Sequence, residues 1–198
     1  TKIAASFDGK TALSNGKSKW ITSEESRKDV QKYRARSCGI LTSISTVMAD
    51  NPSLNVRLDD FNDVYQPTRI ILDSNLRIVG EENVLKLPGK KYIYTLKKDH
   101  NDPQIRSIIR TTKEVNGRIA LLDVMKDLGS DEMNEVLVEA GSVLNGALLK
   151  ESLIDEIVLY LAPCFLGDKA KGMFDLPILN EMSEKYDFKI NDVSQIGP

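Results

Sequence analysis

Short apolar segments alternate along this chain with longer segments whose apolar residues recur at helical spacing. The clearest strand pattern is Arg-Ile-Ile-Leu-Asp at residues 69–73. Further strands are predicted at residues 2–6, 39–42, 91–95, 118–121, 135–139 and 156–162, with a weaker one at 188–190. Strands that alternate with helices favour a parallel sheet covered by helices on both faces. The sequence therefore predicts an α/β three-layer sandwich with a mostly parallel central sheet.

Four helices are predicted between these strands. Thr22 followed by Glu25 fits a capping box, so the first helix is expected to begin there and to run to about Arg36. The others are expected at residues 45–48, 122–129 and 143–150, and Pro52 limits the extent of the second. Residues 58–66 read as a surface loop rather than a linker. We therefore expect residues 1–198 to form a single domain.

Charge and cysteine content exclude several classes of function. The net charge is −2 and no long basic block occurs, which argues against a nucleic-acid partner. The two cysteines, Cys38 and Cys164, are far apart, so reduced thiols and a cytoplasmic location are expected. A single histidine, His100, leaves no basis for a zinc site or a histidine triad, and no metal is predicted. No apolar run approaches the roughly 20 residues of a membrane span.

The turn after residues 135–139 is the strongest candidate for a binding site. Ligands of such folds gather at the carboxyl ends of the strands. Gly141 precedes a predicted helix, whose free N–H groups and dipole suit a phosphate or pyrophosphate. The alternative is a simple tight turn between strand and helix. Glu139 ends a buried strand, where an unpaired carboxylate is costly, so it needs a structural partner or a ligand.

Two further clusters precede or follow the first predicted helix. Trp20 is placed to stack on a flat ring and Ser18 to bind a phosphate, although a single Trp is more often a core residue. Arg34, Asp50 and Arg57 together suit a sugar phosphate and a proton donor. The alternatives are solvated surface charge and, for Asp50, a local Asx-turn. These clusters alone identify no reaction.

Taken together, the segments resemble the riboflavin-biosynthesis reductase family, which has a dihydrofolate-reductase-like fold. The resemblance is carried by KIAASFDGK (2–10), GKSKWIT (16–22), RKDVQ (27–31), YRA (33–35), GILT (39–42), TV (46–47), DNPSLNVR (50–57), VEAG (138–141), LYLAP (159–163) and LG (166–167). It covers nearly the full length and is most specific between Trp20 and Arg57. Many relatives have Asp where this chain has Asn51, which leaves Asp50 as the one carboxylate of that turn.

The resemblance implies reduction of 5-amino-6-(5-phosphoribosylamino)uracil by NADPH, with residue roles to match. Substrate binding is implied for Ser18, Arg34, Leu54, Arg57 and Glu139. Cofactor binding is implied for Ala4, Trp20, Thr46, Asp50, Ser74, Gly141, Ser142, Val143, Leu144, Asn145, Gly146 and Ala147. Ser74, helped by Arg77, is expected at the phosphate of the adenosine ribose. Catalytic roles are assigned to Asp50, Lys2 and Glu139.

The expected reaction opens the ribose of the substrate and delivers hydride to its C1′, giving a ribitylamino product. Arg34 and Arg57, with Ser18, are expected to hold the 5′-phosphate, and Glu139 the pyrimidine or a sugar hydroxyl. Asp50 and Lys2 both remain candidates for proton transfer. Three alternatives stay open: a reductase acting on the diaminopyrimidinone before deamination, a true dihydrofolate reductase, and a non-catalytic nucleotide-binding module.

The resemblance also bears on partners. A homodimer is expected, and many bacterial relatives carry a zinc deaminase domain upstream of the reductase. The deaminase signatures, His-x-Glu and Pro-Cys-x-x-Cys, do not occur in this sequence, so if the whole protein is bifunctional, its deaminase domain is expected before Thr1. The abrupt ends of the sequence, and the missing strand that relatives carry after Gly197-Pro198, fit a piece of a longer protein.

Overall fold

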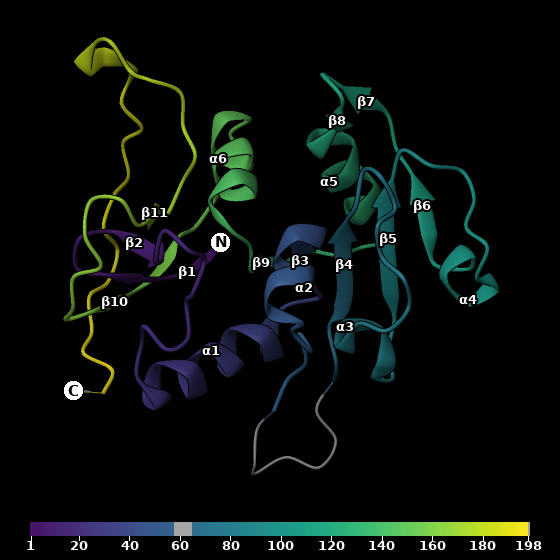
Figure 1. Cartoon of the computed structure of the whole chain (residues 1–198), viewed down its shortest axis with the longest axis horizontal. Helices are drawn as coiled ribbons and strands as arrows, with labels where there is room; N and C mark the ends of the chain where they lie inside the picture. The colour runs from purple at the N-terminus through teal and green to yellow at the C-terminus, as the bar shows by residue number, and fades with distance from the viewer. Residues whose placement is uncertain (58–64, 198) are drawn as a thin grey trace.

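The computed structural model describes residues 1–57 and 65–197, so most of the loop expected at 58–66 lies outside the described residues (Figure 1). The strands are β1 (Lys2–Ser6), β2 (Lys10–Ala12), β3 (Gly39–Ser43), β4 (Thr68–Leu72), β5 (Lys91–Thr95), β6 (Ile109–Thr111), β7 (Glu114–Val115), β8 (Arg118–Ile119), β9 (Val136–Val138), β10 (Val158–Ala162) and β11 (Lys171–Gly172). The helices are α1 (Glu24–Arg36), α2 (Ile44–Asp50), α3 (Asn83–Lys86), α4 (Pro103–Arg106), α5 (Leu121–Ser130), α6 (Ser142–Lys150) and a short 3₁₀ turn (Met182–Glu184).

The central sheet has five strands in the order β6-β5-β4-β3-β9, and every neighbouring pair is parallel. Alternate side chains of a strand point to opposite faces, so each strand contributes to two cores. Leu41 packs with α5 and α6 on one face, whereas Ile40 packs with α2, α3 and α4 on the other. The predicted three-layer α/β sandwich with a mostly parallel sheet is confirmed.

A second, smaller sheet carries the start of the chain. β1 pairs in parallel with β10, so that Lys2 faces Val158 and Ser6 faces Ala162. Thr1 links this sheet to the central one, because its hydroxyl donates to the carbonyl of Val138 at 3.2 Å. β1 thereby presents Lys2 beside the carboxyl end of β9.

Several predicted boundaries are wrong in ways that local chemistry explains. Ser23, not Thr22, caps α1, because its hydroxyl accepts from the amide of Ser26 at 3.3 Å. Gly129 does not end α5, which continues to Ser130. The weak strand predicted at 188–190 is not formed, since those residues are exposed and find no ladder partner within the described chain.

The strand predicted at 118–121 is formed but is shorter, because only Arg118–Ile119 belong to β8, and it is the second arm of a hairpin. β7 and β8 pair antiparallel, with Val115 opposite Arg118. The two residues between them, Asn116 and Gly117, have φ of 51° and 75°. Positive φ at both positions is the requirement of a type I′ turn, which Asn-Gly satisfies best. The hairpin stands apart from the central sheet, beside α5 (Figure 1).

Candidate functional site

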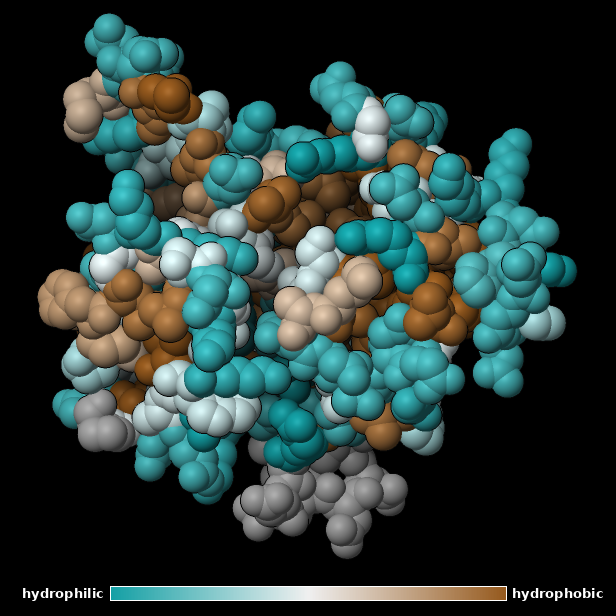
Figure 2. All heavy atoms as spheres, in the orientation of Figure 1, coloured by the Kyte–Doolittle hydropathy of each residue, from teal (hydrophilic) through white to brown (hydrophobic). Residues whose placement is uncertain are grey.

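One large cleft, with a volume of about 1440 Å³, opens at the carboxyl ends of β3, β4 and β9. Its walls come from the start of α6, the α2 segment, the β7–β8 hairpin and residues 171–177. Figure 2 shows the hollow between α6 and the hairpin, with hydrophobic side chains at its floor. This is the position at which parallel α/β sheets bind ligands.

Glu139 lies at the end of β9 in the centre of a charged cluster. Its side chain is only 10% exposed and forms a bidentate ion pair with Arg34, at 2.6 Å to Nε and 3.0 Å to Nη2. The Lys2 Nζ lies 3.3 Å from Oε2, the carboxylate oxygen that also accepts from Arg34 Nη2. Burial alone raises the pKa of Glu139, but Lys2 and Arg34 outweigh it and lower the pKa to about 2. Glu139 is therefore a fixed anion at neutral pH.

Arg34 connects this charged cluster to the loop of residues 54–57. Its third contact is from Nη1 to the carbonyl of Asn55 at 2.9 Å. The guanidinium has five N–H donors, so two remain for a ligand. Leu54, one residue before Asn55, is held at a φ of 47° and also lines the cleft. The backbone amide of Arg57 donates to Gln31 at 3.0 Å, which fixes this loop along α1.

The first turn of α6 presents backbone donors to the cleft. Its N-cap, Gly141, provides no side-chain cap, and the amides of Ser142, Val143 and Leu144 have no hydrogen-bond acceptor within the described chain. A helix start with free N–H groups attracts anions. A side chain at Gly141 would meet no atom within 4 Å, so the approach to this turn is open.

Polar groups gather again where β4 ends. The Asp73 side chain is fully buried and accepts from the amide of Ile78 at 2.9 Å, while its Oδ1 has no hydrogen-bond partner among the described residues. Burial raises the pKa of Asp73 against the lowering effect of backbone donors and Arg77. Arg77 lies 4.0 Å from that Oδ1 and donates to the Ser45 hydroxyl at 3.3 Å. Ser74 follows Asp73 in the cleft wall.

Residues from the two clusters that flank the first predicted helix also line the cleft. Ser18 and Asp50 both line it, and Lys19 Nζ contacts the Asp50 carbonyl at 3.4 Å. Trp20 is 71% exposed and stacks under Arg27, whose Cζ is 4.4 Å from the ring centroid. Trp20 is therefore not a core residue, which removes the alternative considered for it.

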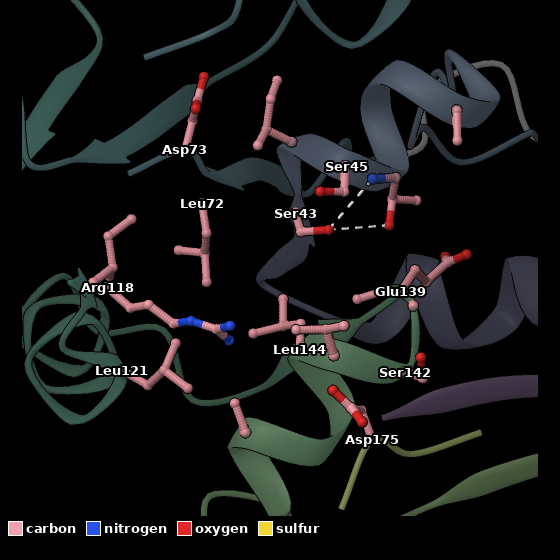
Figure 3. A pocket seen from close by; sticks show the side chains of 18 of the residues that line it. Ser43, Ser45, Leu72, Asp73, Arg118, Leu121, Glu139, Ser142, Leu144 and Asp175 are labelled. Carbon is pink, nitrogen blue, oxygen red and sulfur yellow. Dashed lines mark hydrogen bonds between the residues drawn. The ribbon is translucent and has the colours of Figure 1, made fainter. Parts of the chain in front are cut away.

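Most of the expected site residues come together in this one cleft. Lys2, Ser18, Arg34, Thr46, Asp50, Leu54, Ser74, Arg77, Glu139, Gly141, Ser142, Val143, Leu144 and Ala147 all line it (Figure 3). Ala4, Trp20, Arg57, Asn145 and Gly146 are not among the described lining residues. Asn145 is 1% exposed, and its amide nitrogen donates to the carbonyls of Ala140 and Met173 at 3.3 and 3.4 Å.

Thr46 has a structural role at the start of α2. Its amide donates to the Ser43 hydroxyl at 3.3 Å, which caps the helix, and its own hydroxyl lies 3.2 Å from the same atom (Figure 3). The turn that ends α2 is also fixed. Asn51 adopts a φ of 43° and bonds to Asn83 through both its side chain and its carbonyl, at 2.8 and 3.1 Å. Asn at this position therefore joins α2 to α3.

Sequence reasoning missed three parts of the cleft. Asp73 was treated only as the end of a strand, although a carboxylate there faces the same edge as Glu139. The Asn116-Gly117 pair was an available hairpin signal, and it brings Arg118 to the cleft. Lys171 and Asp175 also line the cleft, but no local pattern in that irregular segment indicates so.

The fold and the cleft define an α/β domain of the dihydrofolate-reductase-like class with a ligand site at its strand ends. A family model described as the RibD C-terminal domain matches residues 1–198. The protein named riboflavin biosynthesis protein RibD of Escherichia coli is 37% identical, over 100% of this chain and 56% of its own length. A 5-amino-6-(5-phosphoribosylamino)uracil reductase of Buchnera aphidicola subsp. Acyrthosiphon pisum is 40% identical, over 94% of this chain and 95% of its own length.

Solved structures agree with these relatives. Acinetobacter baumannii RibD (form 1) superposes with a TM-score of 0.86 at 35% identity, over 98% of this chain and 54% of that one. A Thermotoga maritima protein described as both a deaminase and a uracil reductase gives 0.80 at 25% identity, covering 98% of this chain and 53% of that one. This chain belongs to the RibD C-terminal domain family. It spans about half the length of the RibD relatives it matches.

Proposed function

We propose that this chain is the NADPH-dependent reductase that converts the ribose of 5-amino-6-(5-phosphoribosylamino)uracil into the ribitylamino product. The observation that carries the proposal is one cleft that joins the free amides of α6 to the Glu139 cluster. A dinucleotide needs an anion-binding site for its pyrophosphate and an apolar part of the cleft for its rings. A phosphoribosylamine needs cations and hydrogen-bond acceptors nearby. Family membership supports the same reaction, because relatives carry the names of riboflavin-biosynthesis reductases.

The residues present fit a nicotinamide dinucleotide. The unpaired amides of Ser142, Val143 and Leu144 suit its pyrophosphate. Ser74 and Arg77, at the end of β4, suit a phosphate on the adenosine ribose and favour NADPH over NADH. NADPH, when bound, supplies the hydride for C1′ of the opened ribose. The protein supplies position, charge and protons.

Substrate binding falls to the other half of the cleft. Glu139, ionised and held by two cations, accepts hydrogen bonds from the pyrimidine or from a sugar hydroxyl. The two remaining donors of Arg34, together with Ser18, bind the 5′-phosphate. Arg57 is exposed and lies outside the described lining of the cleft, so its side chain turns inward when it joins them. Because Lys2 and Arg34 contact the same carboxylate, Glu139 also fixes their geometry.

The proton that completes the reduction comes from Asp50 or Lys2. A low pKa excludes Glu139 as the donor at neutral pH. Lys2 is close to the proposed substrate contacts, because its Nζ lies 3.3 Å from Glu139. Asp50 lines the cleft from the end of α2. Substitution of each residue separates the two assignments.

The relatives support a proposal about which domain precedes this one in the whole protein. The Thermotoga maritima protein is described as a deaminase as well as a reductase, which supports a deaminase domain upstream of Thr1. A homodimer in the cytoplasm is our expectation for the whole protein. No described helix is both long enough and apolar enough to cross a membrane.

Purified protein, NADPH and the phosphoribosylamino-uracil test the proposal directly. Loss of reduced-nicotinamide absorbance, with a gain of two hydrogens in the mass of the pyrimidine compound, is the expected result. The diaminopyrimidinone analogue and dihydrofolate serve as competing substrates in the same assay. Faster turnover of either would reassign the substrate, and NADPH oxidation that no substrate accelerates would favour a binding module.

A further inference from the structure

The β7–β8 hairpin reaches over the cleft from the side opposite α6. Its turn and second arm, Asn116 to Ile119, all line the cleft. The type I′ geometry of Asn116 and Gly117 fixes the direction of the second arm. Ile119 is 6% exposed and packs into the core shared with α5, which anchors the hairpin at its base. Arg118 therefore sits on a fixed support rather than on a loose loop.

The Arg118 side chain extends from this hairpin into the cleft. Figure 3 shows its guanidinium directed towards Leu144, with Leu72 and Leu121 on either side. Its backbone belongs to the hairpin ladder, but no hydrogen bond or ion pair joins the Arg118 side chain to any residue that the structure describes. Arg118 is an exposed residue, so its guanidinium is open to solvent and to a ligand, while the neighbours that Figure 3 labels are apolar.

The surroundings of Arg118 differ from those of Arg77. Arg77 lies with Asp73, Ser45 and Ser74, a set of polar groups that suits a phosphate. The neighbours of Arg118 that Figure 3 labels are leucines, which offer no second donor to a phosphate oxygen. Apolar side chains on one face and a planar cation on the other are the surroundings that suit a flat aromatic ring.

We propose that Arg118 is a further binding residue that stacks on the adenine ring of the dinucleotide and holds it against Leu72, Leu121 and Leu144. The inference rests on the proposed function, since it concerns the cofactor of that same cleft. It places the adenine between the hairpin and α6, beyond the pyrophosphate site and away from Glu139. Arg118 thus secures the adenosine half of the cofactor and leaves the reacting half untouched.

Calorimetric titration of the purified protein with three cofactor fragments tests this assignment. The fragments are 5′-AMP, 2′,5′-ADP and nicotinamide mononucleotide. Arg118→Ala is expected to weaken 5′-AMP and 2′,5′-ADP by the same factor, roughly 5-fold, because the stacking of the planar guanidinium on the aromatic ring is lost. Binding of nicotinamide mononucleotide is expected to stay unchanged. Arg106→Ala is the control, since Arg106 is paired with Asp99 outside the cleft.

Arg118→Lys separates the effect of stacking from that of charge, because lysine keeps the positive charge but lacks the planar guanidinium. It is expected to weaken 5′-AMP nearly as much as the alanine variant does. If the variants lose affinity for 2′,5′-ADP alone, Arg118 binds the phosphate and not the adenine ring. If both adenine fragments bind with unchanged affinity, Arg118 does not contact the cofactor. Either result overturns the inference while the wild type still oxidises NADPH with substrate. A wild type that binds neither adenine fragment would overturn both proposals.

Discussion

At the scale of residues, the site depends on one carboxylate that two cations hold. Glu139 is buried at the end of β9, and an isolated anion there would be strongly unfavourable. Arg34 comes from α1 and Lys2 from β1, so three distant segments meet at one group. The sequence analysis predicted that Glu139 needs a partner and that Arg34 belongs to the site. That the two form one ion pair was not predictable, because the pairing depends on how α1 crosses the sheet.

Glu139→Gln should destabilise the protein at pH 7 by an amount on the order of 3 kcal/mol, since folding lowers the pKa of Glu139 from 4.5 to about 2. A depressed carboxylate pKa stabilises the fold above the unfolded value and loses this effect as pH falls towards the folded one. The difference between wild type and variant should therefore shrink from about pH 4.5 to pH 2. Urea unfolding at several pH values measures it.

Glu135→Gln provides the control for this experiment. Glu135 pairs with Arg36 at the other end of β9, but its side chain is 43% exposed. Exposed pairs contribute at most about 1 kcal/mol. Equal losses for the two variants, or a Glu139 effect that does not change with pH, would contradict the account.

Asp50→Asn should lower kcat by about 100-fold and leave NADPH affinity nearly unchanged, because an amide keeps the shape of the side chain but cannot donate the proton. Steady-state kinetics and calorimetric NADPH titration give the two quantities. Asp99→Asn, in an exposed pair with Arg106, is the matched control. If kcat survives the change at Asp50, the proton comes from Lys2.

At the scale of elements, the cleft depends on close packing of α6 against the segment that follows β11. Gly146 lies in the middle of α6 and meets the backbone of Asp175, whose amide donates to the carbonyl of Ser142 at 3.0 Å. A Cβ at Gly146 would overlap that backbone. A helix at residues 143–150, which corresponds to α6, was predicted from the sequence. Its packing partner could not be predicted, because residues 171–177 carry no periodic pattern.

Gly146→Ala should therefore cost about 1–3 kcal/mol of stability, the usual effect of overpacking. The same change should weaken NADPH binding, since the displaced segment forms a wall of the cleft. Gly129→Ala is the control, because Gly129 lies within α5 and an added Cβ meets nothing within 4 Å. That variant should be neutral or up to about 1 kcal/mol more stable. Thermal unfolding in which both variants behave alike would refute the packing argument.

Other elements show which secondary-structure predictions from the sequence were correct and which were not. The bounds of buried strands such as β4 and β5 were predicted within a residue or two, because a short apolar run between turns is typical of a buried strand. The hairpin at Asn116-Gly117 was missed although its turn signal is strong. The predicted strand at 188–190 failed because a strand exists only with a partner, and the described chain offers none.

At the scale of the whole molecule, the C-terminal segment carries several apolar side chains that the described chain does not bury. Ile178, Phe188, Ile190 and Val193 are 88%, 52%, 78% and 83% exposed, and the segment runs extended along one side of the molecule (Figure 1). Monomers seldom expose so many apolar side chains in one segment. The expected homodimer gives these side chains a place to be buried.

Replacement of Phe188 and Ile190 by Asp should convert the expected dimer into monomers, because two charges would enter the interface that we expect these apolar side chains to form. Light scattering after size-exclusion chromatography measures the mass. Lys189→Asp tests whether a charge change alone has the same effect. A wild type that runs as a monomer at micromolar concentration would contradict the expectation.

The central claim is that hydride passes from the nicotinamide to C1′ of the substrate within the cleft between α6 and Glu139. NADPH that carries deuterium at the transferable C4 position, supplied with the phosphoribosylamino-uracil, tests it most directly. Proton and deuterium NMR of the ribitylamino product should place one deuterium on C1′. Deuterium at any other carbon, or a reduced product without label, would contradict the account.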